Sequence, residues 1–198
     1  MSSLVLASTS SYRMALLEKL GIPFIAVAPN IDEQAKENET AEHLVVRLAI
    51  EKATTVAISH PDGLIIGSDQ VCVLNNQITG KPHNKTNAMI QLSQASGQCI
   101  TFYTGLCLYN GKSGQYEALC ETFEVHFRQL TESEISAYLD KERPWNCAGS
   151  FKCEGLGIAL FDRLAGSDPN TLVGLPLISL TKLLIKAGIN PLTYQSGR

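Results

Sequence analysis

Short apolar runs alternate with segments of helical periodicity along most of the chain, and this alternation restricts the fold more than any other feature. Residues 4–7 form a continuous apolar run typical of a buried strand, and the segment after them repeats apolar side chains at helical spacing until Gly21. Further along, Thr40 is a favourable N-cap for a long helix, and residues 64–67 form another apolar run. Strands that alternate with helices pack in layers, so the sequence predicts an α/β or α+β fold with a mixed sheet.

The second half of the chain continues this pattern. Residues 99–109 and 116–127 have the composition of two long strands joined by a Gly-containing turn, and residues 131–134 have the sequence of a capping box that would open a helix. Residues 145–176 are rich in Gly and break into short elements. No repeat, low-complexity stretch or linker interrupts the sequence, so we expect a single domain over residues 1–198, built as one body or as two lobes that share a cleft.

Charge and hydropathy exclude two classes of partner. The chain carries 16 basic and 19 acidic residues, and its net charge of −3 gives no general attraction for a nucleic-acid backbone. No apolar run approaches the roughly 20 residues that span a bilayer, and the N-terminus lacks the pattern of a signal peptide. We therefore expect neither a nucleic-acid polymer nor a membrane as partner, and an anionic ligand would need a local site.

The cysteines and histidines predict a reducing compartment and no zinc site. The six cysteines contain no C-x-x-C pair, and most lie among apolar neighbours, where a free thiol behaves as a small hydrophobic group. The four histidines form no cluster, so a histidine metal site is not expected. The simplest localisation is the cytoplasm. These residues are Cys72, Cys99, Cys107, Cys120, Cys147, Cys153, His43, His60, His83 and His126.

The first candidate site is the Ser-Thr-rich turn between the first apolar run and the helical segment. Unpaired backbone N–H groups at a helix N-terminus favour anions. The hydroxyls of Ser8, Ser10 and Ser11 would add donors, and Arg13 in the first helical turn can hold a phosphate with two hydrogen bonds. The alternative is a serine N-cap followed by a solvent-exposed arginine, and the local sequence does not decide between the two.

The second candidate is Asp69, in the segment GSDQV at residues 67–71. A carboxylate in an otherwise apolar strand is costly to bury unless it is paired, hydrogen-bonded or bound to a metal. Residues at the ends of buried strands often face the ligand crevice of α/β folds. The alternative is a strand-ending turn with a solvated aspartate, but apolar residues on both sides argue against a loop. We therefore favour a functional role for Asp69.

Other charged residues are candidates for a functional site only if the fold brings them together. Glu33 lies in an acidic loop, Lys52 on the predicted long helix, and Lys81 before Pro82, which favours an extended geometry. Each of these is, taken alone, more often a surface charge. Glu154, in a Gly-containing segment, is likewise either a ligand-facing carboxylate or part of a structural loop.

Several short segments together resemble the Maf family of nucleotide pyrophosphatases along nearly the whole chain. No P-loop or dinucleotide-binding fingerprint competes with this assignment, and residues 168–176 are interpreted as a mainly architectural turn. Each matching segment alone is weak evidence for the resemblance, but all of them in this order in a chain of this length are strong evidence for it. The matching text is LASTSSYRMALLEKLG near the start, then IDE (31–33), EKA (51–53), GSDQV (67–71), GKP (80–82), TG (104–105), AGSF (148–151) and VGLP (173–176).

The resemblance implies a fold, a reaction and a cofactor. The family's fold is an elongated α/β structure with a mixed sheet and two lobes flanking a central cleft, often found as a homodimer. Its members use a divalent metal to hydrolyse a nucleoside triphosphate to the monophosphate and pyrophosphate. Hard oxygen ligands favour Mg or Mn as that metal. Such a reaction needs positioning and charge neutralisation more than covalent steps.

Position by position, the resemblance also implies residue roles. Asp69 matches the proposed base that activates water, and Asp69 with Glu33, the second acidic residue, are the expected metal ligands. Lys52 and Lys81 are counted with these carboxylates as catalytic. The groups that would contact the phosphates are Arg13, Lys52, Lys81 and the hydroxyl of Ser8.

Three departures from the commonest pattern of the family resemble the branch that acts on 7-methyl-GTP rather than on dTTP and UTP. Tyr12 stands in place of a usual arginine, Gln70 in place of a threonine and Glu154 in place of a glutamine. A carboxylate only accepts hydrogen bonds, which suits the adjacent N1–H and N2–H donors of guanine. We therefore expect Glu154 to contact the base, Gln70 to shape the base pocket, and Phe151 or Tyr12 to stack on the methylated ring.

Two other functions stay open at this point. One is a dTTP/UTP or broader non-canonical nucleotide pyrophosphatase. The other, of a different class, is a nucleotide-binding regulator of cell division, the role that gave the family its name. A carboxylate in a strand otherwise free of charge favours the enzyme, and a comparison of nucleotides as substrates would separate the two pyrophosphatases.

Overall fold

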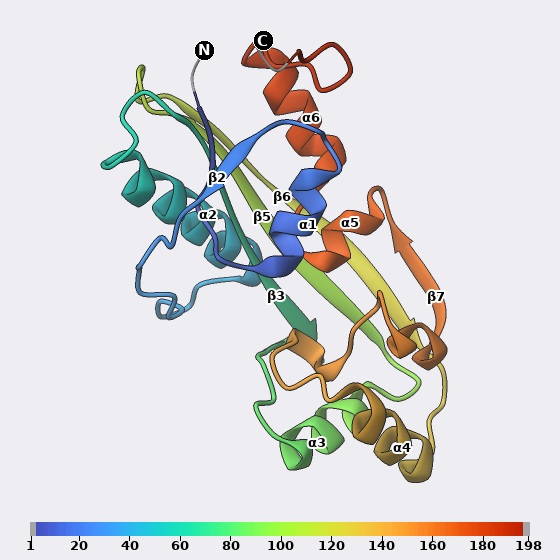
Figure 1. Ribbon diagram of the computed structural model, residues 1–198. Helices are drawn as coiled ribbons and strands as arrows, with labels where there is room; N and C mark the ends of the chain where they lie inside the picture. The colour runs from blue at the N-terminus through green and yellow to red at the C-terminus, as the bar shows by residue number, and fades with distance from the viewer. Residues whose placement is uncertain (1–2, 196–198) are drawn as a thin grey trace. The chain divides into compact units, whose positions relative to one another are not determined.

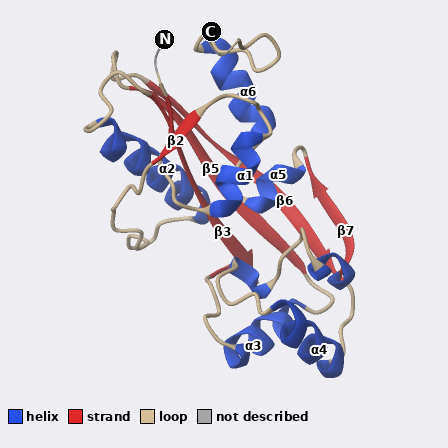
Figure 2. Ribbon diagram, viewed as in Figure 1, coloured by secondary structure: helices blue, strands red, loops and turns tan. Residues whose placement is uncertain are grey.

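The computed structural model of the protein describes residues 3–195 (Figure 1). Its strands are β1 (Leu4–Leu6), β2 (Phe24–Ala26), β3 (Leu64–Leu74), β4 (Gln77–Thr79), β5 (Cys99–Asn110), β6 (Tyr116–Phe127) and β7 (Phe161–Gly166). In the described chain they form one seven-stranded sheet in the order β2-β1-β3-β5-β6-β7, with β4 paired to β3 (Figure 2). Strand β1 is parallel to β2 and β3, whereas β4 and β7 pair antiparallel to their neighbours. The predicted α/β class with mixed pairing is therefore confirmed.

The helices are α1 (Ser11–Glu18), α2 (Ala41–Ala57), α3 (Lys85–Ala95), α4 (Glu132–Glu142), α5 (Pro169–Val173) and α6 (Leu177–Lys186), with two short 3-10 helices, η1 (Ala148–Ser150) and η2 (Leu156–Leu160). The predicted caps are confirmed, because Thr40 accepts a hydrogen bond at the start of α2 and Thr131 forms a capping box with Glu134 at the start of α4. Within residues 3–195, no helix combines the length and the apolar composition that a membrane span requires.

The chain divides into two compact units, each assembled from segments far apart in sequence. Among the described residues, the first unit comprises 3–70, 104–121 and 168–195, and the second comprises 71–103 and 122–167. Three of the four boundaries fall inside β3, β5 and β6, so these strands contribute to both units, and the fourth falls between β7 and α5. No linker marks the division in the sequence, because most of its boundaries lie within strands.

The first unit buries its part of the sheet on both faces. Successive residues of a strand point to opposite faces. Accordingly, Leu4 and Leu6 of β1 pack in one core cluster with residues of α1 and α6, whereas Val5 packs in another with residues of α2. A strand that is covered on both sides needs no polar alternation, which explains its continuous apolar run.

Two glycines allow α2 to lie very close to the sheet. A Cβ atom at Gly67 of β3 would stand 2.0 Å from the backbone oxygen of Ala49, and one at Gly105 of β5 would stand 2.1 Å from that of Val45. Contacts this short do not occur between real atoms, so any side chain at either position would push the helix away. These glycines belong to the GSDQV and TG segments, and they bring α2 residues after Ala49 next to β3.

The core of the second unit contains a group of four phenylalanines. Phe151 contacts Phe102, Phe127 and Phe161 edge to face, with ring centroids 5.0 to 5.5 Å apart. Phe151 is also 5% exposed. Because its ring is surrounded by these neighbours, the expectation that Phe151 stacks on a ligand base is wrong. Tyr12, in the first unit, is exposed and stays a candidate for that role.

Candidate active site

The turn between β1 and α1 is stabilised by its own hydroxyl groups. The hydroxyl oxygen of Ser10 accepts a hydrogen bond from the backbone N–H of Arg13 at 3.4 Å, and that of Ser8 accepts one from the N–H of Ser10 at 3.2 Å. Ser8 is buried. The interpretation of the turn as an N-cap is therefore correct for Ser10. The buried hydroxyl of Ser8 stabilises the turn as an acceptor, and its O–H remains available as a donor.

Arg13 is partly buried, so its interpretation as a solvent-exposed arginine is wrong. Its Nε donates a hydrogen bond to the backbone oxygen of Gly174 at 2.9 Å, which fixes the guanidinium against the loop after α5. Burial lowers the pKa of Arg13, whereas the nearby carboxylates of Asp69 and Glu33 raise it. Because arginine is not deprotonated in proteins at neutral pH, the guanidinium keeps its positive charge.

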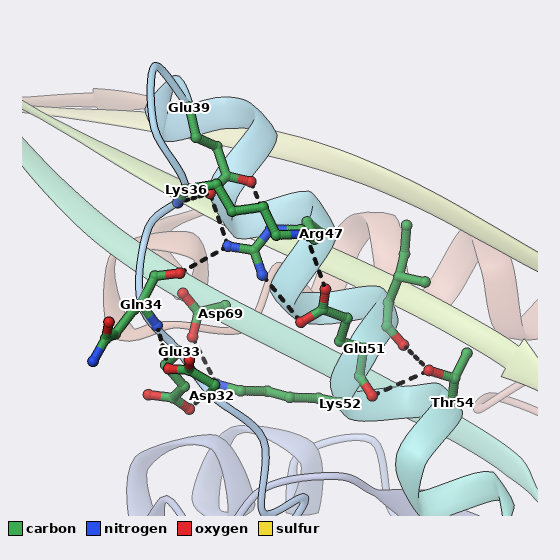
Figure 3. Close-up of polar contacts among 11 residues, drawn as sticks. Asp32, Glu33, Gln34, Lys36, Glu39, Arg47, Glu51, Lys52, Thr54 and Asp69 are labelled. Atoms are coloured by element: carbon green, nitrogen blue, oxygen red, sulfur yellow. Dashed lines mark hydrogen bonds and ion pairs between the residues drawn. The ribbon is translucent and has the colours of Figure 1, made fainter.

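A lysine and two carboxylates form the centre of the site (Figure 3). The Nζ atom of Lys52, on α2, lies 2.6 Å from Oδ1 of Asp69 on β3 and 2.6 Å from Oε1 of Glu33 in the loop before α2. Lys52 is 4% exposed and Asp69 8%, whereas the Glu33 side chain is 59% exposed. The structure therefore brings together three of the residues singled out from the sequence, and each comes from a different element.

Asp69 lies inside β3, which continues through residue 74, as the apolar residues on both sides of it predicted. The alternative, a solvated aspartate in a turn that ends the strand, is wrong. A charge can stay within a buried strand only if it is paired. Lys52 and Arg13 supply two positive charges against the two negative charges of Asp69 and Glu33, which leaves the group formally neutral.

The loop that carries Glu33 is fastened to α2 by Arg47 (Figure 3). The guanidinium of Arg47 donates from Nε to Oε1 of Glu39 at 2.6 Å and from Nη2 to Oε2 at 2.8 Å, a two-pronged ion pair. It also donates to Glu51 at 3.0 Å and to the backbone oxygen of Gln34, next to Glu33, at 3.0 Å. The hydrogen bond from Arg47 is the main reason that the pKa of Glu39 falls to about 2.

Arg47 is not among the residues that were singled out from the sequence. Its spacing of four residues from Glu51 predicts an ion pair on one face of the helix, and that pair is present at 3.0 Å. The contacts with Glu39 and Gln34 depend on how the loop folds back, and no local pattern indicates them.

Gln70 and Ser68 tie β3 to the segment after β7. The side-chain amide of Gln70 donates to Oγ1 of Thr104 at 3.0 Å and to two backbone oxygens of α5 at 2.8 and 3.2 Å. The hydroxyl of Ser68 donates at 3.0 Å to the backbone oxygen of Gly174, which also accepts from Arg13. The amide donors of Gln70 are thus used within the protein, and they help to hold the loop that positions Arg13.

The segment 168–176 is architectural, as predicted. The carboxylate of Asp168 accepts hydrogen bonds from the backbone N–H groups of Asn170 and Ile178, both at 2.8 Å, and so joins the starts of α5 and α6. Gly174 ends α5 with a φ of 118°, which side chains other than glycine rarely adopt. This geometry presents its backbone oxygen to Arg13.

Two of the predicted site residues lie in the second unit. Lys81 is exposed between β4 and α3. Glu154 is also exposed, and its Oε2 accepts a hydrogen bond from the thiol of Cys153 at 3.3 Å. Within the described part of the chain, neither side chain has a charged partner. Ion pairs therefore do not fix the orientation of either side chain.

Comparison with known proteins decides the family. The sequence model of the family described as Maf-like protein matches residues 3–187. The chain belongs to the Maf-like family. This Maf-like protein is 56% identical over 196 residues to a protein of Colwellia psychrerythraea (strain 34H) named 7-methyl-GTP pyrophosphatase, and the match covers 99% of this chain and 98% of that one. Among solved structures, that of the Staphylococcus aureus Ham1 protein overlaps 64% of this Maf-like chain and 72% of its own, with a TM-score of 0.46 and 14% identity.

Proposed function

We propose that this Maf-like protein is a nucleoside triphosphate pyrophosphatase that hydrolyses 7-methyl-GTP to 7-methyl-GMP and pyrophosphate. The observation that carries the proposal is the buried contact of Lys52 with Asp69 and Glu33, in a chain 56% identical to the Colwellia 7-methyl-GTP pyrophosphatase. Hydrolysis of a phosphoanhydride requires a base for the attacking water and cations that offset the charge on the phosphates. The first unit holds both kinds of group in contact.

In this proposal Asp69 is the general base. Lys52 contacts its Oδ1 and so fixes the orientation of the carboxylate, which leaves the second oxygen to accept a proton from water. Arg13 and Lys52 would contact the phosphate oxygens and offset their developing charge, and Lys81 would add a third cation. The hydroxyl of Ser8 and the N–H groups that start α1 would orient the phosphates.

We also propose a divalent metal, Mg or Mn, held by Asp69 and Glu33. These residues fit such an ion, because each offers a hard oxygen and both oxygens lie within 2.6 Å of one cation, the Lys52 ammonium. A metal bound there would polarise a phosphate oxygen and lower the pKa of a bound water.

The experiment is a product analysis with 7-methyl-GTP, GTP, dTTP and UTP in the presence of Mg or Mn. We expect 7-methyl-GMP and pyrophosphate as the products that form fastest, and Asp69→Asn should lower kcat by a factor of about a hundred or more. Asp62→Asn, at an exposed aspartate, is the matched control. Faster turnover of dTTP or UTP would favour the alternative pyrophosphatase, and absence of turnover of every nucleotide would favour the regulator of cell division.

Base specificity is the finer part of the proposal and rests on Glu154. Its carboxylate would accept from N1–H and N2–H of guanine, and glutamine would turn a donor toward one of those groups. Glu154→Gln should therefore lower kcat/KM for 7-methyl-GTP and raise it for dTTP or UTP, particularly together with Gln70→Thr. An unchanged ratio of the two kcat/KM values would remove Glu154 from base recognition and leave the pyrophosphatase assignment untouched.

Location and assembly complete the proposal. We place the protein in the cytoplasm, since its six cysteines are free thiols, as a reducing compartment favours. The resemblance to the family also supports a homodimer. Fractionation of cells and light scattering of the purified protein test these two statements.

A further inference from the structure

A side-chain cluster in the second unit has the composition of a zinc site. Cys99 at the start of β5 and Glu124 and His126 on β6 each offer one ligand atom, and these atoms lie within 4.8 Å of one another. Thiolate, imidazole and carboxylate are the side-chain ligands that zinc takes in proteins. No histidine metal site was expected from the sequence, because the four histidines form no cluster there. In this site the histidine is joined by a cysteine 27 residues away in sequence, Cys99.

The sheet itself places these three side chains together. Glu124 and His126 are two residues apart on β6, so their side chains point to the same face. The backbone N–H of Phe127 donates to the oxygen of Gln98 at 2.9 Å, which fixes the start of β5 beside the end of β6. The ligand atoms are therefore carried by paired strands rather than by a loop.

Two separations in the cluster match the edges of a tetrahedral zinc shell. The Sγ atom of Cys99 lies 3.7 Å from Nε2 of His126, and that nitrogen lies 3.1 Å from Oε2 of Glu124. Bond lengths of about 2.3 Å to sulfur and about 2.0–2.1 Å to nitrogen or oxygen give tetrahedral edges of about 3.3–3.6 Å. Small side-chain shifts would thus close the three ligands around an ion, with water in the fourth position.

The present hydrogen bonds leave one contact of His126 unsatisfied. Its Nε2 also lies 2.7 Å from Nη2 of Arg163. If Nε2 carries a proton, it can donate to Glu124, but that proton then faces the N–H of Arg163. If Nε2 carries no proton, it can accept from Arg163, but its lone pair then also faces the carboxylate of Glu124. A metal cation would satisfy the lone pairs of both ligands. In the structure the guanidinium of Arg163 supplies the positive charge beside Nε2 of His126, and because Arg163 is exposed, its side chain can move into solvent.

We propose that Cys99, Glu124 and His126 bind one zinc ion and that Arg163 swings away when it binds. The thiol of Cys99 loses its proton to solvent in this step, so one proton is released. The soft sulfur and the imidazole select zinc over magnesium, in contrast to the two oxygen donors of Asp69 and Glu33. This inference does not depend on the proposed function.

The test is a titration of the reduced, metal-free protein with Zn²⁺, and in parallel with Co²⁺, in excess Mg²⁺ to occupy hard oxygen sites. We expect Co²⁺ to give a sulfur-to-metal charge-transfer band in the near ultraviolet. Cys99→Ser should abolish this band. Both Cys99→Ser and His126→Ala should weaken zinc binding by at least about tenfold, the loss that changes around metal ligands produce. Arg163→Ala should strengthen binding, since a competing cation is removed.

Cys153→Ser is the matched control, because that thiol also contacts a carboxylate, Glu154, at 3.3 Å but has no histidine contact among residues 3–195. It should bind zinc like the wild type. As a measurement independent of any variant, zinc should protect Cys99 from alkylation more than Cys153, as read by mass spectrometry. Equal zinc affinities of Cys99→Ser, His126→Ala and wild type, loss of the cobalt band in Cys153→Ser, or alkylation of Cys99 that zinc leaves unchanged would each overturn the proposal.

Discussion

The two lysines expected to contact phosphate lie in different units and in opposite environments. Lys52, in the first unit, is 4% exposed and contacts Asp69 and Glu33, whereas Lys81, in the second unit, is exposed and has no charged partner within the described residues. A buried, paired ammonium is oriented before a ligand arrives, but an exposed lysine must lose side-chain entropy when it binds. Under the proposed function, Lys52 in the first unit is therefore a preorganised cation, whereas Lys81 in the second is one that the ligand must order.

The largest expected effect follows from replacing each lysine with methionine. Lys52→Met leaves Asp69 buried without its partner, and breaking a buried ion pair costs about 3–5 kcal/mol of stability. Its kcat should also fall by about a hundredfold or more, since a preorganised cation is lost. Lys81→Met should lower kcat/KM but change the free energy of unfolding by less than about 0.5 kcal/mol. Denaturant unfolding and steady-state kinetics measure both, and equal destabilisation by the two variants would remove the contrast between the units.

The same contrast separates what the sequence could predict from what it could not. Caps such as Thr40 and Thr131 depend on a few neighbouring residues, so they were predicted correctly. Asp69 was singled out by its apolar context, and Glu33 and Lys52 as charges whose meaning depends on the fold. Their shared role came from the resemblance, because no rule of spacing brings together a helix, a strand interior and a loop. The expectation that Phe151 stacks on the base was wrong, because the sequence of its segment resembles a loop whereas its ring packs in the core.

The next largest effect concerns Gly67, which sets the distance between α2 and β3. In Gly67→Ala the new Cβ would meet the backbone oxygen of Ala49 at 2.0 Å, so the helix must move and carry Lys52 with it. We expect a loss of stability of about 1–3 kcal/mol, typical of overpacking, together with a lower kcat. Gly80→Ala is the stability control, since a Cβ there would meet nothing within 4 Å. A Gly67→Ala protein as stable as Gly80→Ala would show that the close approach is not required.

A smaller effect is expected from Arg47, which acts on the first unit through the loop of Glu33. Arg47→Lys keeps the charge but loses the two-pronged contact with Glu39. The loop should then hold Glu33 less firmly, and kcat/KM should fall by about tenfold, less than the hundredfold that a displacement of about 1 Å can produce. The matched control is Arg128→Lys in the second unit, which likewise keeps the charge but loses the guanidinium contact with Glu134, and it should leave kcat/KM unchanged.

A double-mutant cycle shows whether Arg47 acts through Glu33. If it does, Arg47→Lys should have no further effect on kcat/KM in a protein that already carries Glu33→Gln, because coupled residues are not additive. Additive losses would mean that Arg47 supports the site by another route, such as the orientation of α2.

The smallest effect is a dependence of stability on pH that belongs to Glu39. The hydrogen bond from Arg47 lowers the pKa of Glu39 from 4.5 to about 2, so the folded protein binds fewer protons than the unfolded chain between these values. The contribution of Glu39 to stability is then fully present above pH 4.5 and is lost as the pH falls toward 2. The free energy of unfolding of wild type minus that of Glu39→Gln should be constant above about pH 5 and shrink below it, while other carboxylates cancel in the difference. A difference that stays constant across this window would show that Glu39 is not held as an ion pair, and the loop of Glu33 would then need another anchor.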